Sequence, residues 1–456
     1  MHDAIDLGVA GVRPLDFLSR EPETWRRVHE RLHATAFLRS EGTVVTVGPP
    51  QRASRPLVET CREVVRRFDR FFAGAAQTYF EREALRTDYL VNTLIEPLLA
   101  IDRAAPVHLP LARLDCVLAP DGSLRVIEIN PVGVTLIHLR SLLYLVRGLW
   151  RAGLHDAAIE LDSLAGAAIE SFDRTYRLCH QQPRPRPTLG ALTPAGWLRA
   201  TNFLLRDAFR RRGWDYVWGG PSALEVTDRG IQLAGRAVDV LWPDFLFYWA
   251  YQQSRYSQTR FPSAIADYSR TPEQAAAILA DGRFLGHLRE RRVVHLSPAT
   301  SYLCLSKSLL SWIHDQERPV PDGDREWLER HVARTFSARD RSRGALSREQ
   351  ARADRPRLLV KPCQYGGSHG VRLGCETSDA EWAAALDALW NDDAWVVQEY
   401  WPPAQARDGS FVSLGLASHG GELGGITLRA GPARVVSARD SAFVPVAIDQ
   451  ADSKRG

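Results

Sequence analysis

Two short stretches, Arg113-Leu-Asp-Cys-Val-Leu118 and Leu124-Arg-Val-Ile-Glu-Ile-Asn130, govern the interpretation of the whole chain. Each alternates polar and apolar residues, and the turn signal Pro120–Ser123 lies between them, so together they predict a β-hairpin. Residues two apart on a strand share a face of the sheet. The polar side chains expected on one face of this hairpin are Arg113, Asp115, Glu128 and Asn130.

These four side chains have the chemistry of a metal and phosphate site. Two carboxylates and an amide oxygen are hard ligands that suit Mg²⁺ better than zinc, and the arginine beside them suits phosphate oxygens. The alternative is a hairpin with its charges turned to solvent. Ile127 and Ile129 flank Glu128, and Pro131 follows the strand at once, which argues against that alternative.

Lysine is rare in this chain, which has Lys307, Lys361 and Lys454 alone. Lys361 follows the apolar run Leu358–Val360 and precedes a loop that contains three glycines. An ammonium is a compact point charge with three donors, and glycines let backbone N–H groups approach an anion closely. The context of Lys361 therefore suits phosphate binding, although chance survival of a lysine beside an ordinary surface turn would give the same pattern. The three glycines are Gly366, Gly367 and Gly370.

The order of these segments is more informative than any one of them. It resembles the circularly permuted branch of the ATP-grasp ligases, typified by glutathionylspermidine synthase. That family begins its site with an R-x-D…E-x-N hairpin, then has a lysine, a KP strand with a glycine-rich loop, a glutamine hinge and a G-x-x-x-R…FVP segment. The resemblance covers roughly residues 111–135 and 185–448. The matching later segments are Ser306-Lys307, Lys361-Pro362, Gln398, Gly425–Arg429 and Phe443–Pro445.

The resemblance implies a role for each matching residue. Mg²⁺ would be bound by Asp115, Glu128 and Asn130. The transferred phosphoryl group or acyl phosphate would be steadied by Arg113 and Arg429. The ATP phosphates would contact Lys307 and Lys361, under the loop of Gly366, Gly367 and Gly370. The adenine would be flanked by Gln398 and Glu399.

The activity that the resemblance implies is ATP- and Mg²⁺-dependent ligation of a carboxylate to an amine, through an acyl phosphate and with release of ADP. The expected partners are a small-molecule carboxylate and an amine, such as an amino acid, a small peptide or a polyamine, in peptide or natural-product biosynthesis. The chain departs from glutathionylspermidine synthase at Pro131–Thr135 and at Tyr365–His369. These departures argue against glutathione and spermidine as the substrates.

The expected fold is α/β (α+β), with a permuted ATP-grasp fold as its main part. Residues 1–110 read as mostly helical, and residues 111–180 as the first ATP-grasp segment, with the hairpin and helices. After the proline-rich linker Gln181–Pro187, residues 188–300 read as a Rossmann-like unit. Residues 301–450 would form the nucleotide-binding segment.

Bulk composition excludes several functional classes. The net charge of +4 is modest for this length, and short arginine runs lie beside helical patterns, so we expect no nucleic-acid partner. No apolar run approaches the ~20 residues that a membrane span needs, so we expect no membrane partner. Six cysteines without zinc or disulfide spacing and a start without a basic leader indicate a cytoplasmic protein with reduced thiols.

Two other functional classes remain open. His29-Glu30-Arg31-Leu32-His33 matches the H-E-x-x-H pattern of zinc metallopeptidases, although Arg31 would place a cation inside the metal-binding turn. A non-catalytic ATP-binding protein would need the same phosphate-binding residues. Cys363, two residues after Lys361, is a conceivable nucleophile, because a nearby cation lowers a thiol pKa, but packing of the loop would explain it equally well.

Overall fold

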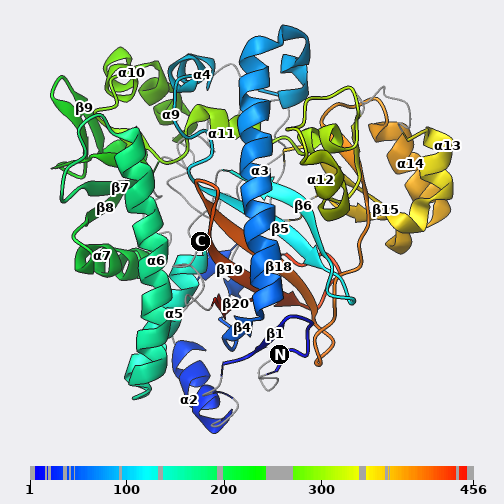
Figure 1. Cartoon of the computed structure of the whole chain (residues 1–456), viewed down its shortest axis with the longest axis horizontal. Helices are drawn as coiled ribbons and strands as arrows, with labels where there is room; N and C mark the ends of the chain where they lie inside the picture. Colours follow the sequence, from blue (N-terminus) through cyan, green and yellow to red (C-terminus); the bar gives the residue numbers. More distant parts are fainter. Residues whose placement is uncertain are drawn as a thin grey trace.

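The fold is mixed α/β, with several sheets and helices. The computed structural model describes residues 6–15, 18, 22–33, 38–40, 43–45, 47–91, 95–131, 137–192, 199–242, 271–337, 346–364, 368, 370–437 and 441–448. A seven-stranded sheet in the centre gathers strands from both ends of the sequence (Figure 1). Its strands in spatial order are β1 (Val12–Pro14), β4 (Gln51–Ala53), β20 (Ala442–Ala447), β19 (Glu422–Gly431), β18 (Phe411–His419), β5 (Ala112–Leu118) and β6 (Leu124–Asn130).

Strands β5 and β6 form the antiparallel hairpin that the sequence predicts. Arg113 pairs with Asn130, and Asp115 pairs with Glu128. The register then shifts, because Cys116 pairs with Val126 and leaves Ile127 as an extra residue in β6. Such an extra residue is a β-bulge, which bends the strand and takes one backbone unit out of the ladder.

Helices cover both faces of the central sheet. On one face, α3 (Arg55–Glu81) packs its apolar stripe, including Phe68, against inward residues such as Leu114 and Leu428. On the other face, α5 (Ile137–Arg151) and α6 (His155–Cys179) form a second core with Phe443 of β20. Burial of one leucine or phenylalanine contributes about 1.5–3 kcal/mol, so two covered faces fix the positions of the strands.

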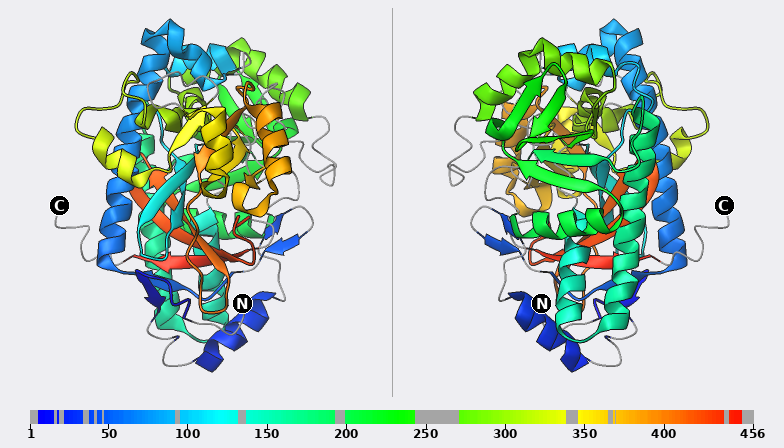
Figure 2. Two further views of the ribbon diagram at one scale, coloured as in Figure 1. Left: turned by 90° about the vertical axis from the view of Figure 1, so that its right-hand side faces the viewer. Right: turned by 90° about the vertical axis from the view of Figure 1, so that its left-hand side faces the viewer.

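A parallel sheet follows the proline-rich linker, within the region that was expected to be Rossmann-like. Its strand order is β13-β12-β7-β8, and every neighbouring pair is parallel. The right-hand view of Figure 2 shows this unit face on. Its elements are β7 (Thr188–Leu192), α7 (Arg199–Arg211), β8 (Asp215–Gly219), β12 (Val240–Trp242) and β13 (Val294–His295). Beside it lie β9 (Leu224–Thr227), β10 (Gly230–Leu233), β11 (Arg236–Ala237), α9 (Thr271–Ala280) and α10 (Gly282–Arg289).

A four-stranded antiparallel sheet, seen face on in the left-hand view of Figure 2, lies beside the β5–β6 hairpin. Its strand order is β14 (Thr335–Ser337), β17 (Trp395–Glu399), β15 (Leu358–Pro362) and β16 (Arg372–Leu373). The helices that cover it are α13 (Arg348–Ala353) and α14 (Asp379–Leu389). Strand β14 was not predicted, because it has three residues and lies inside the charge-rich stretch Arg318–Arg355.

The described part of the N-terminal region contains α2 (Pro22–His33), α3, the 3₁₀ helix η1 (Glu83–Tyr89) and α4 (Glu96–Asp102). It also contains strands that were not predicted. β1 and β4 join the central sheet, and β2 (Leu38–Ser40) pairs with β3 (Thr43–Val45). Each has three residues, too few for alternation to show, and β4 is held by pairing with the distant strand β20.

Two helical stretches are interrupted. Helices α5 and α6 are separated by Gly153, whose φ is +81°. Helix α11 (Ala299–Leu303) is followed by the 3₁₀ helix η5 (Lys307–Ile313). The other short elements are α12 (Arg325–His331), η3 (Pro221–Ala223), η6 (Arg355–Arg357) and η7 (Gly374–Glu376).

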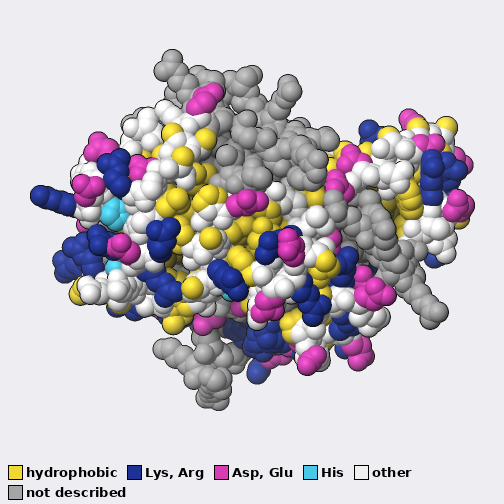
Figure 3. Space-filling view, turned by 90° about the horizontal axis from the view of Figure 1, so that it is seen from above, with side chains coloured by type: hydrophobic (Ala, Val, Ile, Leu, Met, Phe, Trp, Pro, Cys, Tyr) yellow, Lys and Arg dark blue, Asp and Glu magenta, His cyan; other side chains and the backbone are white. Residues whose placement is uncertain are grey.

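The surface mixes charges of both signs, as the modest net charge suggests. On the face seen from above, basic and acidic side chains alternate around apolar patches (Figure 3). Among the described residues, no helix is both long and apolar enough to cross a membrane. All six cysteines are free thiols, and only Cys375 is exposed.

Candidate functional site

The hairpin brings its four predicted polar residues together on one face. Arg113 donates from Nε to Asp115 Oδ1 over 2.5 Å and from a terminal nitrogen to Asp115 Oδ2 over 2.8 Å. Asn130 donates from Nδ2 to Asp115 Oδ2 over 3.1 Å. These side chains are partly buried, so the bidentate ion pair is shielded from solvent and has a fixed orientation.

Two lysines reach the hairpin from elsewhere in the chain. Lys307, the first residue of η5, lies with Nζ 3.4 Å from Glu128 Oε1. Lys361, near the end of β15, donates from Nζ to the backbone carbonyl of Ile127 over 2.6 Å. Both lysine side chains are almost fully buried. The structure therefore brings the two lysines and the two carboxylates together, although about 180 to 250 residues separate them along the chain.

Arg429 completes this charged cluster from strand β19. One of its terminal nitrogens lies 4.0 Å from Asp115 Oδ2, and its guanidinium lies 5.3 Å from the ring centre of Phe443. Strand β18 lies between β19 and β5 and carries Gly415 opposite Asp115. A Cβ on Gly415 would lie 3.0 Å from Arg113 Cδ, so the glycine leaves room for the Arg113 side chain to lie flat on the sheet.

The electrostatics of the cluster follow from burial and neighbouring charges. Burial acts to raise the pKa of Asp115, but the charges of Arg113 and Arg429 outweigh it and hold that pKa below its usual value. Burial, and then the charge of Arg113, lower the pKa of Arg429 to about 10. Burial also lowers the pKa of Lys361 to about 7, against the opposing charge of Glu128. Asp115 thus stays ionised, whereas Lys361 changes its charge near neutral pH.

Gln398 joins the same cluster from β17. It donates from Nε2 to the Ile127 carbonyl over 3.3 Å and to Thr335 Oγ1 over 2.8 Å. The carbonyl can only accept, so the amide nitrogen must face it. Gln398 Oε1 is then a buried acceptor for which no described residue supplies a donor.

The other predicted nucleotide-binding residues are less directly connected to the charged cluster. Glu399 follows Gln398 on the strand, so it points to the opposite face, and its carboxylate accepts from the backbone nitrogen of Arg334 over 3.4 Å. Gly370 has a φ of +73° and packs on Pro362 and Trp395, so a side chain there would be strained. Gly366 and Gly367 lie outside the described residues.

The oxygen donors on the hairpin suit a divalent cation such as Mg²⁺. Asp115 and Glu128 supply carboxylates, and Asn130 can supply Oδ1 when its nitrogen faces Asp115. In the described part of the chain, no group of three or more His, Cys, Asp and Glu residues has the arrangement of a metal site. The hairpin offers two such residues and an amide, so Mg²⁺ bound here would take further oxygen ligands from phosphate or water.

The structure also bears on two residues that suggested other chemistry. Cys363 is fully buried, and burial raises the pKa of its thiol to about 12, so the thiol is protonated at neutral pH and is a poor nucleophile. His29 lies on α2 and packs against Trp25 with ring centres 5.7 Å apart. The side chain of His33 lies outside the described residues.

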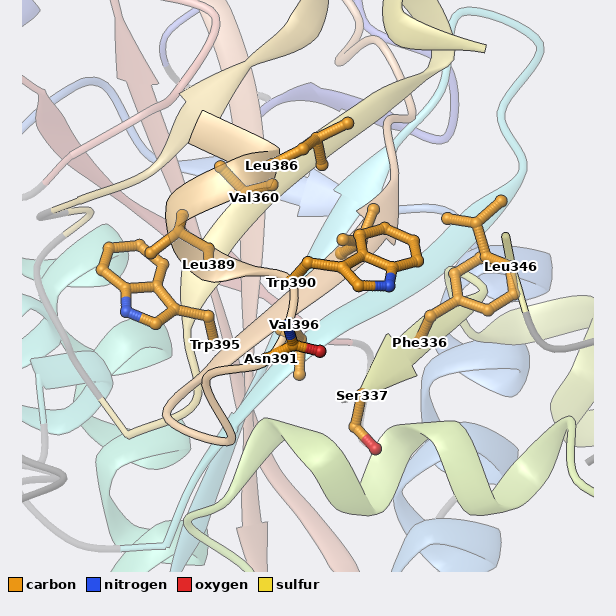
Figure 4. Close-up of a pocket in the computed structure, with 11 residues that line it drawn as sticks. Phe336, Ser337, Leu346, Val360, Leu386, Leu389, Trp390, Asn391, Trp395 and Val396 are labelled. Carbon is orange, nitrogen blue, oxygen red and sulfur yellow. The ribbon is translucent and has the colours of Figure 1, made fainter. Parts of the chain in front are cut away.

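An aromatic cavity of about 120 Å³ lies behind the four-stranded sheet, on the face opposite Lys361. Figure 4 shows Trp395 and Leu389 on one side of it, and Trp390 and Phe336 on the other. Residues alternate between faces along a strand, so Val360 points into this cavity while Lys361 points toward the hairpin. The cavity is therefore separate from the charged cluster.

Sequence reasoning missed two buried polar residues beside the cluster, His138 and Thr427. His138 lies in the first turn of α5, and Thr427 lies on β19, two residues before Arg429. The sequence holds no local signal for them, because the approach of His138 to Gly425 depends on the fold. A Cβ on Gly425 would lie 2.9 Å from His138 Cδ2, so the glycine lets the imidazole pack on the sheet.

Comparisons with known proteins give little guidance. No protein-family model matches this chain, and no curated protein matches it by sequence. A distant structural neighbour is the crystal structure of a proposed gamma-glutamylcysteine synthetase from Methylobacillus flagellatus KT. The two chains are 12% identical and superpose with a TM-score of 0.32, over 82% of this chain and 84% of the other. At this level of similarity, the side chains described above have to carry the functional conclusion.

Proposed function

We propose that this protein is an ATP- and Mg²⁺-dependent carboxylate–amine ligase that works through an acyl phosphate, on a circularly permuted ATP-grasp fold. The observation that supports this most directly is the convergence of four cations on two hairpin carboxylates. The cations come from four separate elements and the carboxylates from one hairpin. The residues are Arg113, Lys307, Lys361 and Arg429, with Asp115 and Glu128.

This charge pattern suits transfer of a phosphoryl group from ATP. The cations outnumber the carboxylates, so an anionic ligand would balance the buried charge, and phosphoryl transfer depends mainly on positioning and charge neutralisation. Mg²⁺, when bound by Asp115, Glu128 and Asn130, would neutralise phosphate charge. Lys307 and Lys361 would contact the ATP phosphates, and Arg113 and Arg429 would hold the phosphoryl group during transfer.

The reaction balances in two steps. In the first, a carboxylate oxygen attacks the γ-phosphorus of ATP, the bond to ADP breaks, and an acyl phosphate and ADP result. In the second, an amine nitrogen attacks the acyl carbon, the bond between carbon and phosphate oxygen breaks, and the proton lost by nitrogen leaves with inorganic phosphate. Gln398 Oε1, a buried acceptor for which no described residue supplies a donor, would receive the 6-amino group of adenine, and this would favour ATP over GTP.

The test is nucleotide release from ATP and Mg²⁺ in the presence of pooled carboxylic acids and amines. We expect ADP that depends on the pool and that falls about 10²- to 10³-fold in Lys361→Ala. Arg372→Ala is the matched control, because Arg372 is an exposed cation on β16, paired with Val360 in the same sheet. AMP in place of ADP would indicate adenylation and would overturn the acyl-phosphate route. ATP binding without turnover in any pool would favour the non-catalytic alternative.

A further inference from the structure

Beyond the charged cluster, the same face of the central sheet carries polar side chains that the proposed reaction has not used. Thr427 lies directly opposite Gly415 on β18, and its side chain is almost fully buried. His138 is similarly buried against the same face. No described residue gives a hydrogen-bond partner to Thr427 Oγ1 or to His138 Nε2. A buried polar atom left unpaired costs about 1–3 kcal/mol, so two of them on one face need a partner, which a bound ligand or a water would supply.

Three side chains surround one point on the sheet. The Arg113 stem lies over Gly415, which is opposite Thr427, and the His138 ring lies over Gly425, two residues before Thr427 on the same face. Arg113, Thr427 and the glycine under His138 all belong to this face, on the neighbouring strands β5 and β19 on either side of β18. The unpaired atoms therefore lie on the same face of the sheet as the arginine that we assign to the acyl phosphate.

A second buried histidine lies behind the first. The rings of His138 and His419 are 5.2 Å apart between centres, and His419 Nδ1 is hydrogen-bonded to Ser171 Oγ. Burial lowers the pKa of His138 well below its usual value and that of His419 to about 3. Both imidazoles are therefore neutral at physiological pH, so the two histidines add no charge on this face beside Arg113.

We propose that Thr427 Oγ1 and His138 Nε2 bind the attacking amino group of the second substrate, a primary amine, in its neutral form; this inference rests on the proposed ligase function. An amine attacks only when its lone pair is free. A carboxylate at the binding site would stabilise the protonated ammonium, which has no free lone pair, and would therefore oppose the reaction. Neutral acceptors next to a cation bind N–H groups without favouring the ammonium. The amine nitrogen then forms its bond to the acyl carbon, phosphate leaves, and the nitrogen proton departs with phosphate.

The first experiment separates amine binding from acyl-phosphate formation. Hydroxylamine serves as the probe amine with ATP, Mg²⁺ and the acid found in the ADP screen, and the hydroxamate product is measured. We expect Thr427→Val to raise the KM for hydroxylamine at least tenfold and to leave the KM values for ATP and acid within about twofold. Thr427→Ser keeps the hydroxyl and should restore the wild-type KM. An unchanged hydroxylamine KM in Thr427→Val, or an equal loss of ADP formation without amine, would overturn the proposal.

The second experiment needs no turnover, so it still tests the amine site if the ligase function fails. Protein labelled with ¹⁵N-histidine is titrated with methylamine, and the His138 signal is identified by its loss in His138→Phe. We expect the His138 Nε2 resonance to shift in the wild type and in Thr427→Ser but not in Thr427→Val. No shift at saturating methylamine in the wild type would overturn the amine assignment.

Thermal stability distinguishes a ligand site from a structural hydrogen bond or a bridging water. Removal of an unpaired hydroxyl should leave the melting temperature of Thr427→Val unchanged or higher. Thr335→Val is the matched control, because the Thr335 hydroxyl is equally buried but donates to the Ala333 carbonyl and accepts from Gln398. We expect that control to melt a few degrees lower. A comparable fall in Thr427→Val would show a structural role and contradict the proposal.

Discussion

Lys361 should make the stability of the folded protein depend on pH in a way that one substitution removes. Its pKa is lowered from 10.5 to about 7 in the folded protein, mainly because it is buried. Between these two values the unfolded chain binds more protons than the folded one, so the free energy of unfolding rises with pH. The slope approaches about 1.4 kcal/mol per pH unit. Because Lys361 is half protonated at pH 7, the expected gain from pH 7 to pH 9 is about 2 kcal/mol.

The assay compares urea unfolding of the wild type and Lys361→Met at pH 7 and pH 9. Methionine has a similar length and no charge, so it removes the titration while filling most of the space. Other groups titrate in both proteins and cancel in the difference. We expect the wild type to gain about 2 kcal/mol relative to Lys361→Met between the two pH values. Equal changes in the free energy of unfolding of the two proteins would refute the lowered pKa of Lys361. They would also refute the conclusion that this buried amine is half protonated near pH 7.

Four other outcomes can be measured. ATP binding at pH 8 should take up close to one proton, because phosphate favours the ammonium of Lys361. Calorimetry in two buffers with different ionisation enthalpies measures this uptake. The same observed binding enthalpy in both buffers would contradict it. Glu128→Gln should lower Mg²⁺-dependent turnover about 10²- to 10³-fold, and an unchanged dependence of rate on Mg²⁺ would remove Glu128 from the metal site. ATP should be preferred over GTP at least about tenfold in kcat/KM, since Gln398 Oε1 opposes the guanine oxygen; equal values would contradict adenine recognition there. Burial raises the Asp69 pKa from 3.8 to about 6, so the folded protein loses stability as pH rises through that range. Asp69→Asn should therefore stabilise the protein by up to about 3 kcal/mol above pH 6, and by little at pH 4. Urea unfolding at both pH values tests this.

Local patterns were sufficient to predict the two strands of the hairpin, but not their register. Alternation of polar and apolar residues and the Pro120–Ser123 turn predict β5 and β6, whereas the pairing of Arg113 with Asn130 depends on the extra residue Ile127, which shifts the register between Cys116 and Asp115. Strand β17 and helix α14 are also specified locally, since both have clear periodicity and helix α14 has a Ser378 capping box. These elements are specified by neighbouring residues.

Features that depend on distant contacts could not be predicted from such patterns. The sheet strand β4 has three residues and is fixed by its parallel partner β20, nearly 400 positions later in the sequence. His138 appears in the sequence as one polar residue among apolar ones on a helix. Its place beside Arg113 depends on Gly425, which leaves room for the ring, and that relation exists only in the folded protein.

The bulge in β6 is the clearest case of a structural feature with a chemical consequence. It removes the Ile127 carbonyl from the hairpin ladder, and this carbonyl then accepts from Lys361 and Gln398, which belong to the other sheet. Two donors on one carbonyl have an advantage for a site that binds phosphate. If ATP draws the Lys361 ammonium away, Gln398 still pairs with the carbonyl, so no buried acceptor is left unsatisfied. Lys361 can therefore exchange a backbone carbonyl for a phosphate oxygen without breaking the contact between the hairpin and the four-stranded sheet.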